Sequence, residues 1–214
     1  MNKLIGSAWI FGAAVAWALL YYTVDEPLAL WISSTRAPWL IRTARMISLP
    51  LSPFLNLCFW PFVLMIERLF FRKKELFWFF LAMALSVIIA MLITGNIKMV
   101  LGRARPYLFT GEFVSGFYGF TTREGYLSAP SSHASVAAAL LFTAQRWQYL
   151  SPLWMLVIGS TLLSRIVLLE HFPSDLVLGL GVGYISYQIV KIGFRRFIPK
   201  EREEIMKIEK ASRK

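Results

Sequence analysis

Three short stretches of this sequence combine cationic, hydroxyl, imidazole and carboxylate side chains at spacings that suit chemistry on an anion. They read KMVLGRARPY, SAPSSHAS and SRIVLLEHFPSDLVLG, and cover residues 98–107, 128–135 and 164–179. The second and third stretches contain His133 and His171, the two histidines of the chain. Lysine and arginine bind oxyanions, and histidine serves as a nucleophile or as a general acid and base. The stretches predict a polar partner that they share.

Each stretch also has features of a helix end. Lys98 and Arg105 are seven residues apart, about two turns, so both lie on one face if the helix continues to Pro106, which stops it. In the third stretch, Pro173 suits a first helical position. That start would place Asp175 in the first turn, within reach of the His171 ring.

The second stretch has the pattern of a helix start. Pro130 suits the first helical position, and the backbone N–H groups after it would lack acceptors inside the helix. Such a start is a natural anion site. Taken singly, an Arg-Pro helix end is more often an interfacial anchor, and a Ser-Ser-His start is more often a simple cap. The combination is what favours a site, since ionisable groups at a membrane are costly.

The elements that carry these stretches are predicted to be membrane helices. The chain has 214 residues, of which 57% are hydrophobic and 16% charged, more apolar side chains than one soluble core can hide. We predict an all-α polytopic membrane protein whose six transmembrane helices lie near residues 4–24, 47–66, 76–97, 132–144, 153–169 and 176–190. Residues 1–198 form the membrane domain in this prediction, and 199–214 form a cytosolic tail. The first run is interpreted as a retained helix rather than a cleaved signal peptide.

Basic residues set the predicted orientation. With both termini in the cytoplasm, 15 of the 23 lysines and arginines fall on the cytoplasmic side, as the positive-inside rule favours. The three polar stretches then share the opposite face. The net charge of +11 is explained by topology and anionic lipid headgroups, and does not require a nucleic-acid partner.

The three stretches resemble the signature of the type 2 phosphatidic acid phosphatase superfamily, K-x6-R-P, P-S-G-H and S-R-x5-H-x3-D. The matching residues occur in the same order: Lys98, Arg105 and Pro106, then Pro130, Ser131, Ser132 and His133, then Ser164, Arg165, His171 and Asp175. One position departs from the pattern, because Ser132 stands where the family usually has glycine. The resemblance runs from about residue 76 to residue 183, and the six-helix layout extends it.

The resemblance implies a phosphohydrolase that uses a phosphohistidine. His171 is the expected nucleophile, Asp175 orients its ring, and His133 is the general acid and then the general base. The expected phosphate-binding residues are Lys98, Arg105, Ser131, Ser132 and Arg165. No metal and no cofactor is expected, and the single cysteine, Cys58, makes no cysteine-based zinc site.

The expected substrate is a membrane lipid phosphate or diphosphate: phosphatidic acid, phosphatidylglycerol phosphate, undecaprenyl diphosphate or lipid A. A bacterial inner membrane, with the site facing the periplasm, is the expected location. Two alternatives remain open, a lipid phosphotransferase and a non-catalytic anion binder or transporter. The sequence leaves open the oligomeric state and whether the aromatic-rich loop at 107–128 covers the headgroup. The segment 34–47 resembles an interfacial helix that guides lipids or simply anchors.

Overall fold

The structure is a computed structural model that describes residues 3–108, 116–144 and 151–197, and in these residues helices are the only regular elements. The predicted tail at 199–214 lies outside the described residues. The helices of ordinary length are α1 Lys3–Thr23, α2 Asp25–Thr35, α3 Pro38–Ser48, α4 Pro53–Ile66, α5 Lys74–Leu101, α6 Ser132–Thr143, α7 Ser151–Val167 and α8 Pro173–Phe197. Shorter turns are η1 Leu49–Leu51, η2 Glu67–Phe71, η3 Pro106–Leu108 and η4 Glu124–Tyr126.

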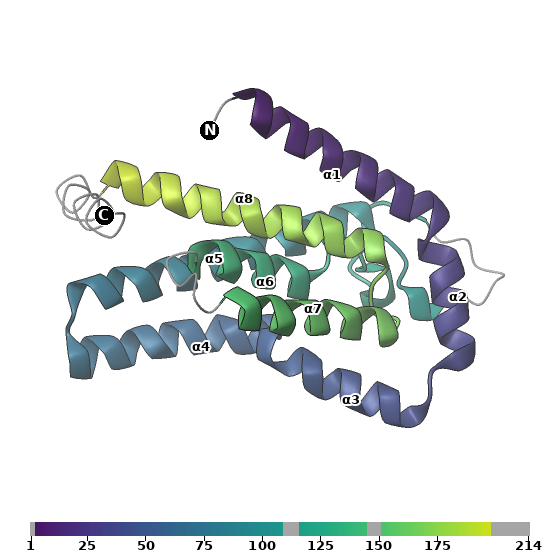
Figure 1. Cartoon of the computed structure of the whole chain (residues 1–214), viewed down its shortest axis with the longest axis horizontal. Helices are drawn as coiled ribbons and strands as arrows, with labels where there is room; N and C mark the ends of the chain where they lie inside the picture. The colour runs from purple at the N-terminus through teal and green to yellow at the C-terminus, as the bar shows by residue number, and fades with distance from the viewer. Residues whose placement is uncertain (1–2, 109–115, 145–150, 198–214) are drawn as a thin grey trace.

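Helices α5 to α8 form a bundle in which α6 packs against both α5 and α8 (Figure 1). The α6–α8 contact is close because glycines of α8 meet the backbone of α6. A Cβ atom added to Gly179 would lie 2.5 Å from the Ser131 carbonyl oxygen, and one added to Gly183 would lie 2.3 Å from that of Ser135. The Gly179 to Gly183 spacing is therefore internal packing, as small residues at membrane helix interfaces permit.

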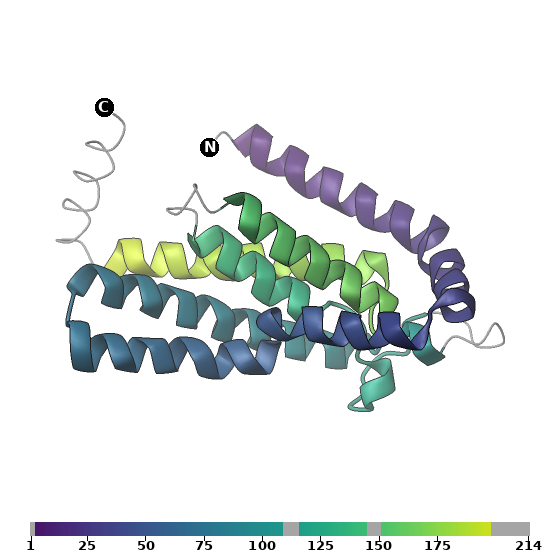
Figure 2. The same ribbon diagram turned by 60° about the horizontal axis from the view of Figure 1, so that its bottom comes forward.

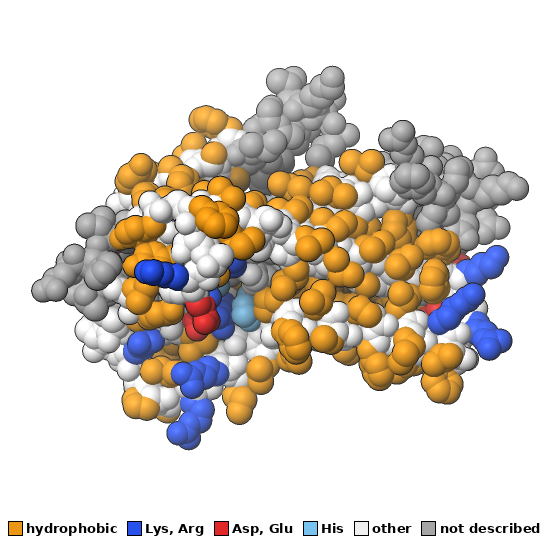
Figure 3. All heavy atoms as spheres, turned by 180° about the vertical axis from the view of Figure 1, so that it is seen from behind, with side chains coloured by type: hydrophobic (Ala, Val, Ile, Leu, Met, Phe, Trp, Pro, Cys, Tyr) orange, Lys and Arg blue, Asp and Glu red, His pale blue; other side chains and the backbone are white. Residues whose placement is uncertain are grey.

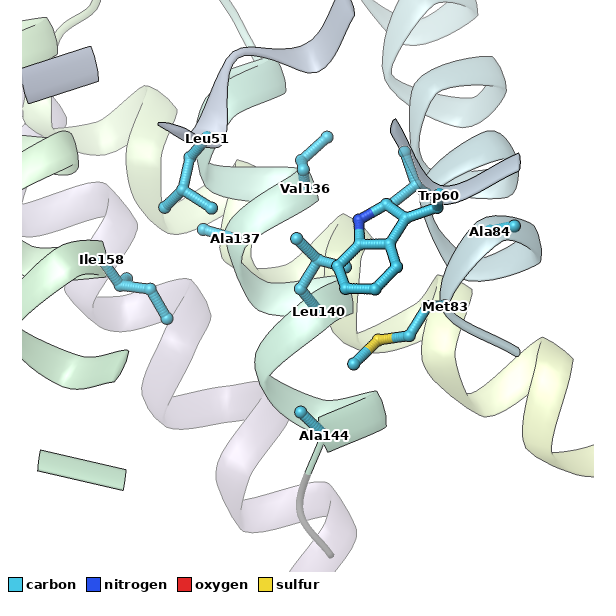
Figure 4. Packing of buried hydrophobic residues seen from close by; sticks show 10 residues of the cluster. Leu51, Trp60, Met83, Ala84, Val136, Ala137, Leu140, Ala144 and Ile158 are labelled. Carbon is cyan, nitrogen blue, oxygen red and sulfur yellow. The ribbon is translucent and has the colours of Figure 1, made fainter. Parts of the chain in front are cut away.

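The core lies along α6, where α4, α5 and α7 meet it. Trp60 of α4, Met83 of α5, Leu140 of α6 and Ile158 of α7 belong to one buried cluster (Figure 4). Where lipid surrounds the helices, burying an apolar side chain between them gains little from leaving water, so close van der Waals contact is the main stabilising term. This packing fixes the relative positions of the helix ends.

Three stretches of the described residues are long and apolar enough to cross a membrane: 38–71, 74–101 and 173–194. The described residues also contain three apolar helices that are shorter than these stretches: Phe11–Thr23, Ser132–Thr143 and Pro152–Val167. Each of the six predicted ranges thus falls largely on a helix. Seen from behind, the surface is mostly hydrophobic, with charged side chains gathered towards its two ends (Figure 3).

The N-terminal part departs from the prediction in its boundaries. The helix expected from residue 47 begins only at Pro53, because Ser52 is extended (φ −55°, ψ 127°) as residues before proline tend to be. Residues 47–51 belong instead to the end of α3 and to η1. Helix α2, which has 11 residues, was not expected from the sequence. Helix α1 diverges from α8 towards its N-terminus in both ribbon views (Figures 1 and 2).

Candidate active site

The three polar stretches meet at one end of the bundle. Lys98 lies in the last turn of α5, His133 is the second residue of α6, Arg165 is in the last turn of α7, and Asp175 is in the first turn of α8. The backbone of Ser131 donates a 3.0 Å hydrogen bond to the carbonyl oxygen of Asp175, which ties the second stretch to the third. Figure 3 shows a histidine side chain beside acidic and basic ones on one face.

The first stretch leaves the helix between Lys98 and Arg105. Helix α5 ends at Leu101, and Gly102 adopts a left-handed conformation (φ 57°). A Cβ atom at Gly102 would lie 1.9 Å from the Gly119 carbonyl oxygen, so glycine is required there. The condition under which Lys98 and Arg105 would share one face, a helix that continues to Pro106, is therefore not met.

The loop after the first stretch brings Arg105 back to the site. The N–H of Arg105 bonds to the Gly125 carbonyl at 2.8 Å, and the N–H of Ser128 bonds to the Arg103 carbonyl at 3.0 Å. The Lys98 ammonium donates to the carbonyl oxygens of Leu127 (2.5 Å) and Ser128 (3.1 Å). The described part of the aromatic-rich loop thus holds the cationic stretch in place, whereas residues 109–115 lie outside the description.

The second stretch starts its helix at Ser132, where the predicted range also begins, and two residues after Pro130. Pro130 follows a cis peptide bond and precedes the helix, which begins at Ser132 with Ser131 as the flanking residue. The interpretation of Pro130 as the first helical residue was therefore wrong. The expected anion-binding position shifts with the helix start, because the first backbone N–H groups of α6 still lack acceptors inside the helix. Ser132 and His133 are half-buried there.

The third stretch agrees with the prediction. Helix α8 begins at Pro173, and Asp175 Oδ2 lies 3.7 Å from His171 Nδ1. This distance is too long for a hydrogen bond, and the contact is an ion pair only when the ring is protonated. Asp175 Oδ2 accepts shorter bonds from the Ser128 hydroxyl (2.6 Å) and the Phe172 N–H (2.9 Å). Burial lowers the pKa of His171 to about 3, against the opposing effect of Asp175, so the ring is neutral at neutral pH.

The remaining cations of the site share one carboxylate. Arg105 and Arg165 both form ion pairs with Glu170, the latter at 3.5 Å. The arginine side chains are 15% and 12% exposed, and that of Glu170 is 30% exposed. His133 lies within electrostatic range of Arg165, His171 and Lys98.

Several buried polar atoms of the site find no hydrogen-bond partner in the described part of the chain. They are Ser131 Oγ, Arg105 Nε, Arg165 Nε and His171 Nδ1. Buried polar atoms of native proteins are nearly always paired, and unpaired ones call for an explanation. Two guanidinium groups, a hydroxyl and the start of α6 converging on one place form a cradle that suits a phosphate-like anion.

Sequence reasoning missed a buried network behind this cradle. Arg103 and Asp25 are fully buried, and Arg103 forms ion pairs with Asp25 at 2.7 Å and with Asp175 at 2.5 Å. Ser174 and Ser128 complete the network through their hydroxyl groups. One signal was available in the sequence: an aspartate directly after an apolar run is costly at a membrane unless a partner neutralises it.

Comparison with known proteins gives the family. The PAP2 superfamily profile matches residues 75–198, more than half of the chain. The chain belongs to the PAP2 superfamily. A lipid A 1-phosphatase of Rhizobium johnstonii is 30% identical over 118 residues, which are 52% of this chain and 46% of the relative. One of Rhizobium etli is 30% identical over 105 residues, 46% of this chain and 43% of the relative. The chain thus aligns with less than half the length of these PAP2 relatives.

Two solved structures share the fold. The PAP2-type phosphatidylglycerolphosphate phosphatase of Bacillus subtilis has a TM-score of 0.62 and 21% identity, covering 90% of this chain and 96% of its own. LpxE of Aquifex aeolicus has a TM-score of 0.58 and 18% identity, covering 79% of this chain and 95% of its own. At these identities the likeness concerns the fold, so the roles of individual residues must be argued from this chain's own geometry.

Proposed function

We propose that this PAP2 protein is an integral-membrane phosphatase that hydrolyses a lipid phosphate or diphosphate through a phosphohistidine. The observation that carries the proposal is the convergence of two guanidinium groups, the Ser131 hydroxyl and the start of α6 beside a neutral, carboxylate-oriented His171. Lys98 adds a third cation. Anion binding alone requires neither an oriented imidazole nor a second histidine.

In the proposed mechanism the cations first fix the phosphoryl group. Arg105 and Arg165 each present a planar guanidinium that can bind two phosphate oxygens, and Lys98 adds a positive charge. Ser131 and the amides at Ser132 and His133 bind oxygens on which charge spreads in the transition state. Phosphoryl transfer depends mainly on such positioning and electrostatic stabilisation.

The first chemical step forms a bond between nitrogen and phosphorus. Because Nδ1 of His171 faces Asp175, Nε2 carries the lone pair that attacks. The bond between phosphorus and the lipid oxygen breaks, and His133, which enters this step protonated, donates its proton to that oxygen, giving the lipid alcohol and phosphohistidine. For a diphosphate, the leaving group is the lipid monophosphate. Asp175 stabilises the positive charge that develops on the ring.

The second step restores the enzyme. His133, now neutral, takes a proton from water, and the oxygen attacks phosphorus as the bond to His171 breaks. Inorganic phosphate leaves, and both histidines return to their starting protonation. His133 and water account for every proton in the cycle, and Lys98, Arg105 and Arg165 supply the positive charge, so the proposal requires no metal or cofactor.

The proposed substrates are lipids because the site lies at one end of a bundle with a mostly hydrophobic surface (Figure 3). Lipid A leads the candidates because the named relatives are lipid A 1-phosphatases. Phosphatidylglycerol phosphate follows because a structural neighbour is named for it, and phosphatidic acid and undecaprenyl diphosphate complete the set. We place six helices across a bacterial inner membrane, with both termini in the cytoplasm and the site facing the periplasm.

The test is phosphate release from these four lipids by the protein purified in detergent, with and without a chelator. We expect release from at least one lipid, unchanged by the chelator, and phosphate labelling of the wild type that His171→Ala abolishes. A candidate lipid acceptor is added in a parallel reaction. Phosphate on that acceptor instead of free phosphate would establish a phosphotransferase, and activity that needs a divalent cation would overturn the mechanism.

A further inference from the structure

Helix α2 braces the turn that carries His171. Ala29 and Ile32 of α2 form a buried cluster with Leu169 and Phe172, which flank the histidine. At the end of the helix, Arg36 donates a 3.3 Å hydrogen bond to the carbonyl oxygen of Leu168. This helix precedes the residues matched by the PAP2 profile, which begin at 75. A segment outside the matched region therefore packs directly on the predicted nucleophile's turn.

The first residue of α2 brings a charge into the site. Asp25 is fully buried, and its carboxylate accepts bonds from the Arg103 guanidinium (2.7 Å), the Ser174 N–H (3.1 Å) and the Ser174 hydroxyl. Burial raises the pKa of Asp25, whereas the bonds from Ser174 and Arg103 oppose that rise. The partners that link the carboxylate to α8 thus favour its charged form against the effect of burial.

Arg103 connects the two aspartates. One of its terminal nitrogens bonds to Asp25, and the other bonds to Asp175 Oδ1 (2.5 Å) and to the Ser174 hydroxyl (2.6 Å). The guanidinium carbon lies 4.5 to 5.5 Å from the ring centroids of Tyr21, Phe117 and Phe172. One cation, enclosed by aromatic rings, is therefore shared between two carboxylates.

We propose that Asp25 and Arg103 are positioning residues that fix the orientation and charge of Asp175, and through it the reactivity of His171. The inference rests on the proposed function, because it assigns them to the same phosphohistidine site. With Asp25 present, Arg103 divides its charge between two carboxylates, and Asp175 keeps enough negative charge to support a cationic ring. When the Asp25 carboxylate charge is removed, the Arg103 guanidinium interacts with Asp175 alone, and Asp175 then stabilises the phosphohistidine less well.

A double-mutant cycle between Asp25→Asn and Asp175→Asn tests this coupling. We expect Asp25→Asn to lower kcat about tenfold, on the scale of a hydrogen bond to a charged group, with KM changed less than about twofold. In the Asp175→Asn background the same substitution should cost less than about twofold, because the group through which it acts has lost its charge. An equal loss in both backgrounds, or a loss confined to KM, would show that Asp25 is merely structural.

Two further variants keep the test decisive. If Asp25→Asn fails to fold, Ser174→Ala takes its place in the test. This substitution leaves both aspartates and Arg103 in place and removes the hydroxyl between them, and it should lower kcat about threefold. Full activity of a folded Ser174→Ala protein would then overturn the inference. The matched control is Glu75→Gln, which also converts an acid to its amide but lies exposed in the first turn of α5, at the opposite end from Lys98. It should match the wild type.

The outcomes separate this inference from the proposed function. Wild-type protein that releases phosphate from none of the four lipids overturns the proposed function, and with it this inference. An active wild type together with an equally active, folded Asp25→Asn variant overturns the positioning role alone and leaves the phosphatase proposal standing.

Discussion

Two arginines of the Gly-Arg-Ala-Arg-Pro sequence lie in contrasting surroundings. Arg103 is fully buried and divides its charge between two aspartates. Arg105, two residues later, is 15% exposed and pairs with Glu170 together with Arg165. We call Asp25, Arg103, Ser128, Ser174 and Asp175 the sealed half of the site, and Arg105, Arg165 and Glu170 the open half.

The difference shows that burial and partners decide the role of a cation. In the sealed half, each charged group contacts a group of opposite charge within the protein, so the half can stabilise the fold and orient His171 but is not open to a ligand. In the open half, one carboxylate serves two guanidinium groups, which leaves binding capacity for another anion. Removing the Arg103 charge should therefore destabilise the fold, whereas removing the Arg105 charge should inactivate the protein without unfolding it.

The largest expected effect is the loss of stability in Arg103→Ala. The substitution leaves two buried carboxylates without their cation, which should cost about 3 to 5 kcal/mol. Thermal unfolding in detergent measures it. The double variant Arg103→Met with Asp25→Asn should recover part of the loss, because it also removes one of the stranded charges. An Arg103→Ala protein as stable as the wild type would contradict the sealed half as described.

Arg105→Ala should give the opposite pattern, an active-site loss without unfolding. We expect kcat/KM to fall about 10² to 10³-fold, as for the removal of one group that stabilises transition-state charge, while the unfolding temperature stays near that of the wild type. Arg105→Lys should restore only part of the activity, because a lysine cannot bind two oxygens in the guanidinium geometry. Unfolding on the scale of Arg103→Ala would remove the contrast between the halves.

The helix-end positions of most site residues could be predicted from the sequence, whereas Asp25 and Arg103 of the sealed half could not. Lys98, His133, Arg165 and Asp175 lie close to helix ends, where apolar runs stop, and those runs are readable from composition and length alone. The helix start at Pro173 was equally readable from local proline preference. Local sequence thus placed each stretch at the correct end of its element.

The sealed half depends on contacts that local patterns do not encode. Asp25 and Arg103 are 78 residues apart, and Arg103 and Asp175 are 72 apart. The path of the chain from α5 to Arg105 also escaped prediction, because the left-handed Gly102 is imposed by the close approach of Gly119 in the following loop. Such tertiary constraints override helical spacing, and so Arg105 reaches the site from a loop instead of a helix face.

The neutral His171 next to the sealed half predicts a dependence of stability on pH. Its pKa is about 3 in the folded protein and about 6.5 in an unfolded chain, so the unfolded state binds the extra proton below pH 6.5. Stability contributed by the neutral ring is present above that pH and is lost as the pH falls towards 3, by up to about 1.4 kcal/mol per pH unit. Unfolding temperatures at pH 7, 6 and 5 should therefore fall more steeply in the wild type than in His171→Asn. Parallel curves would show that the ring is already charged when folded.

The smallest expected effect comes from the open half, in Glu170→Gln. The Glu170 carboxylate and a substrate phosphate compete for the same guanidinium groups of Arg105 and Arg165, so removing its charge should strengthen inhibition by inorganic phosphate. Ion pairs between partly exposed side chains are worth about 1 kcal/mol at most, which limits the fall in the inhibition constant to about fivefold. Glu124→Gln, an exposed acid-to-amide change in η4, is the control. A larger inhibition constant in Glu170→Gln would instead mean that the Glu170 carboxylate holds the two arginines in their binding geometry before the anion binds.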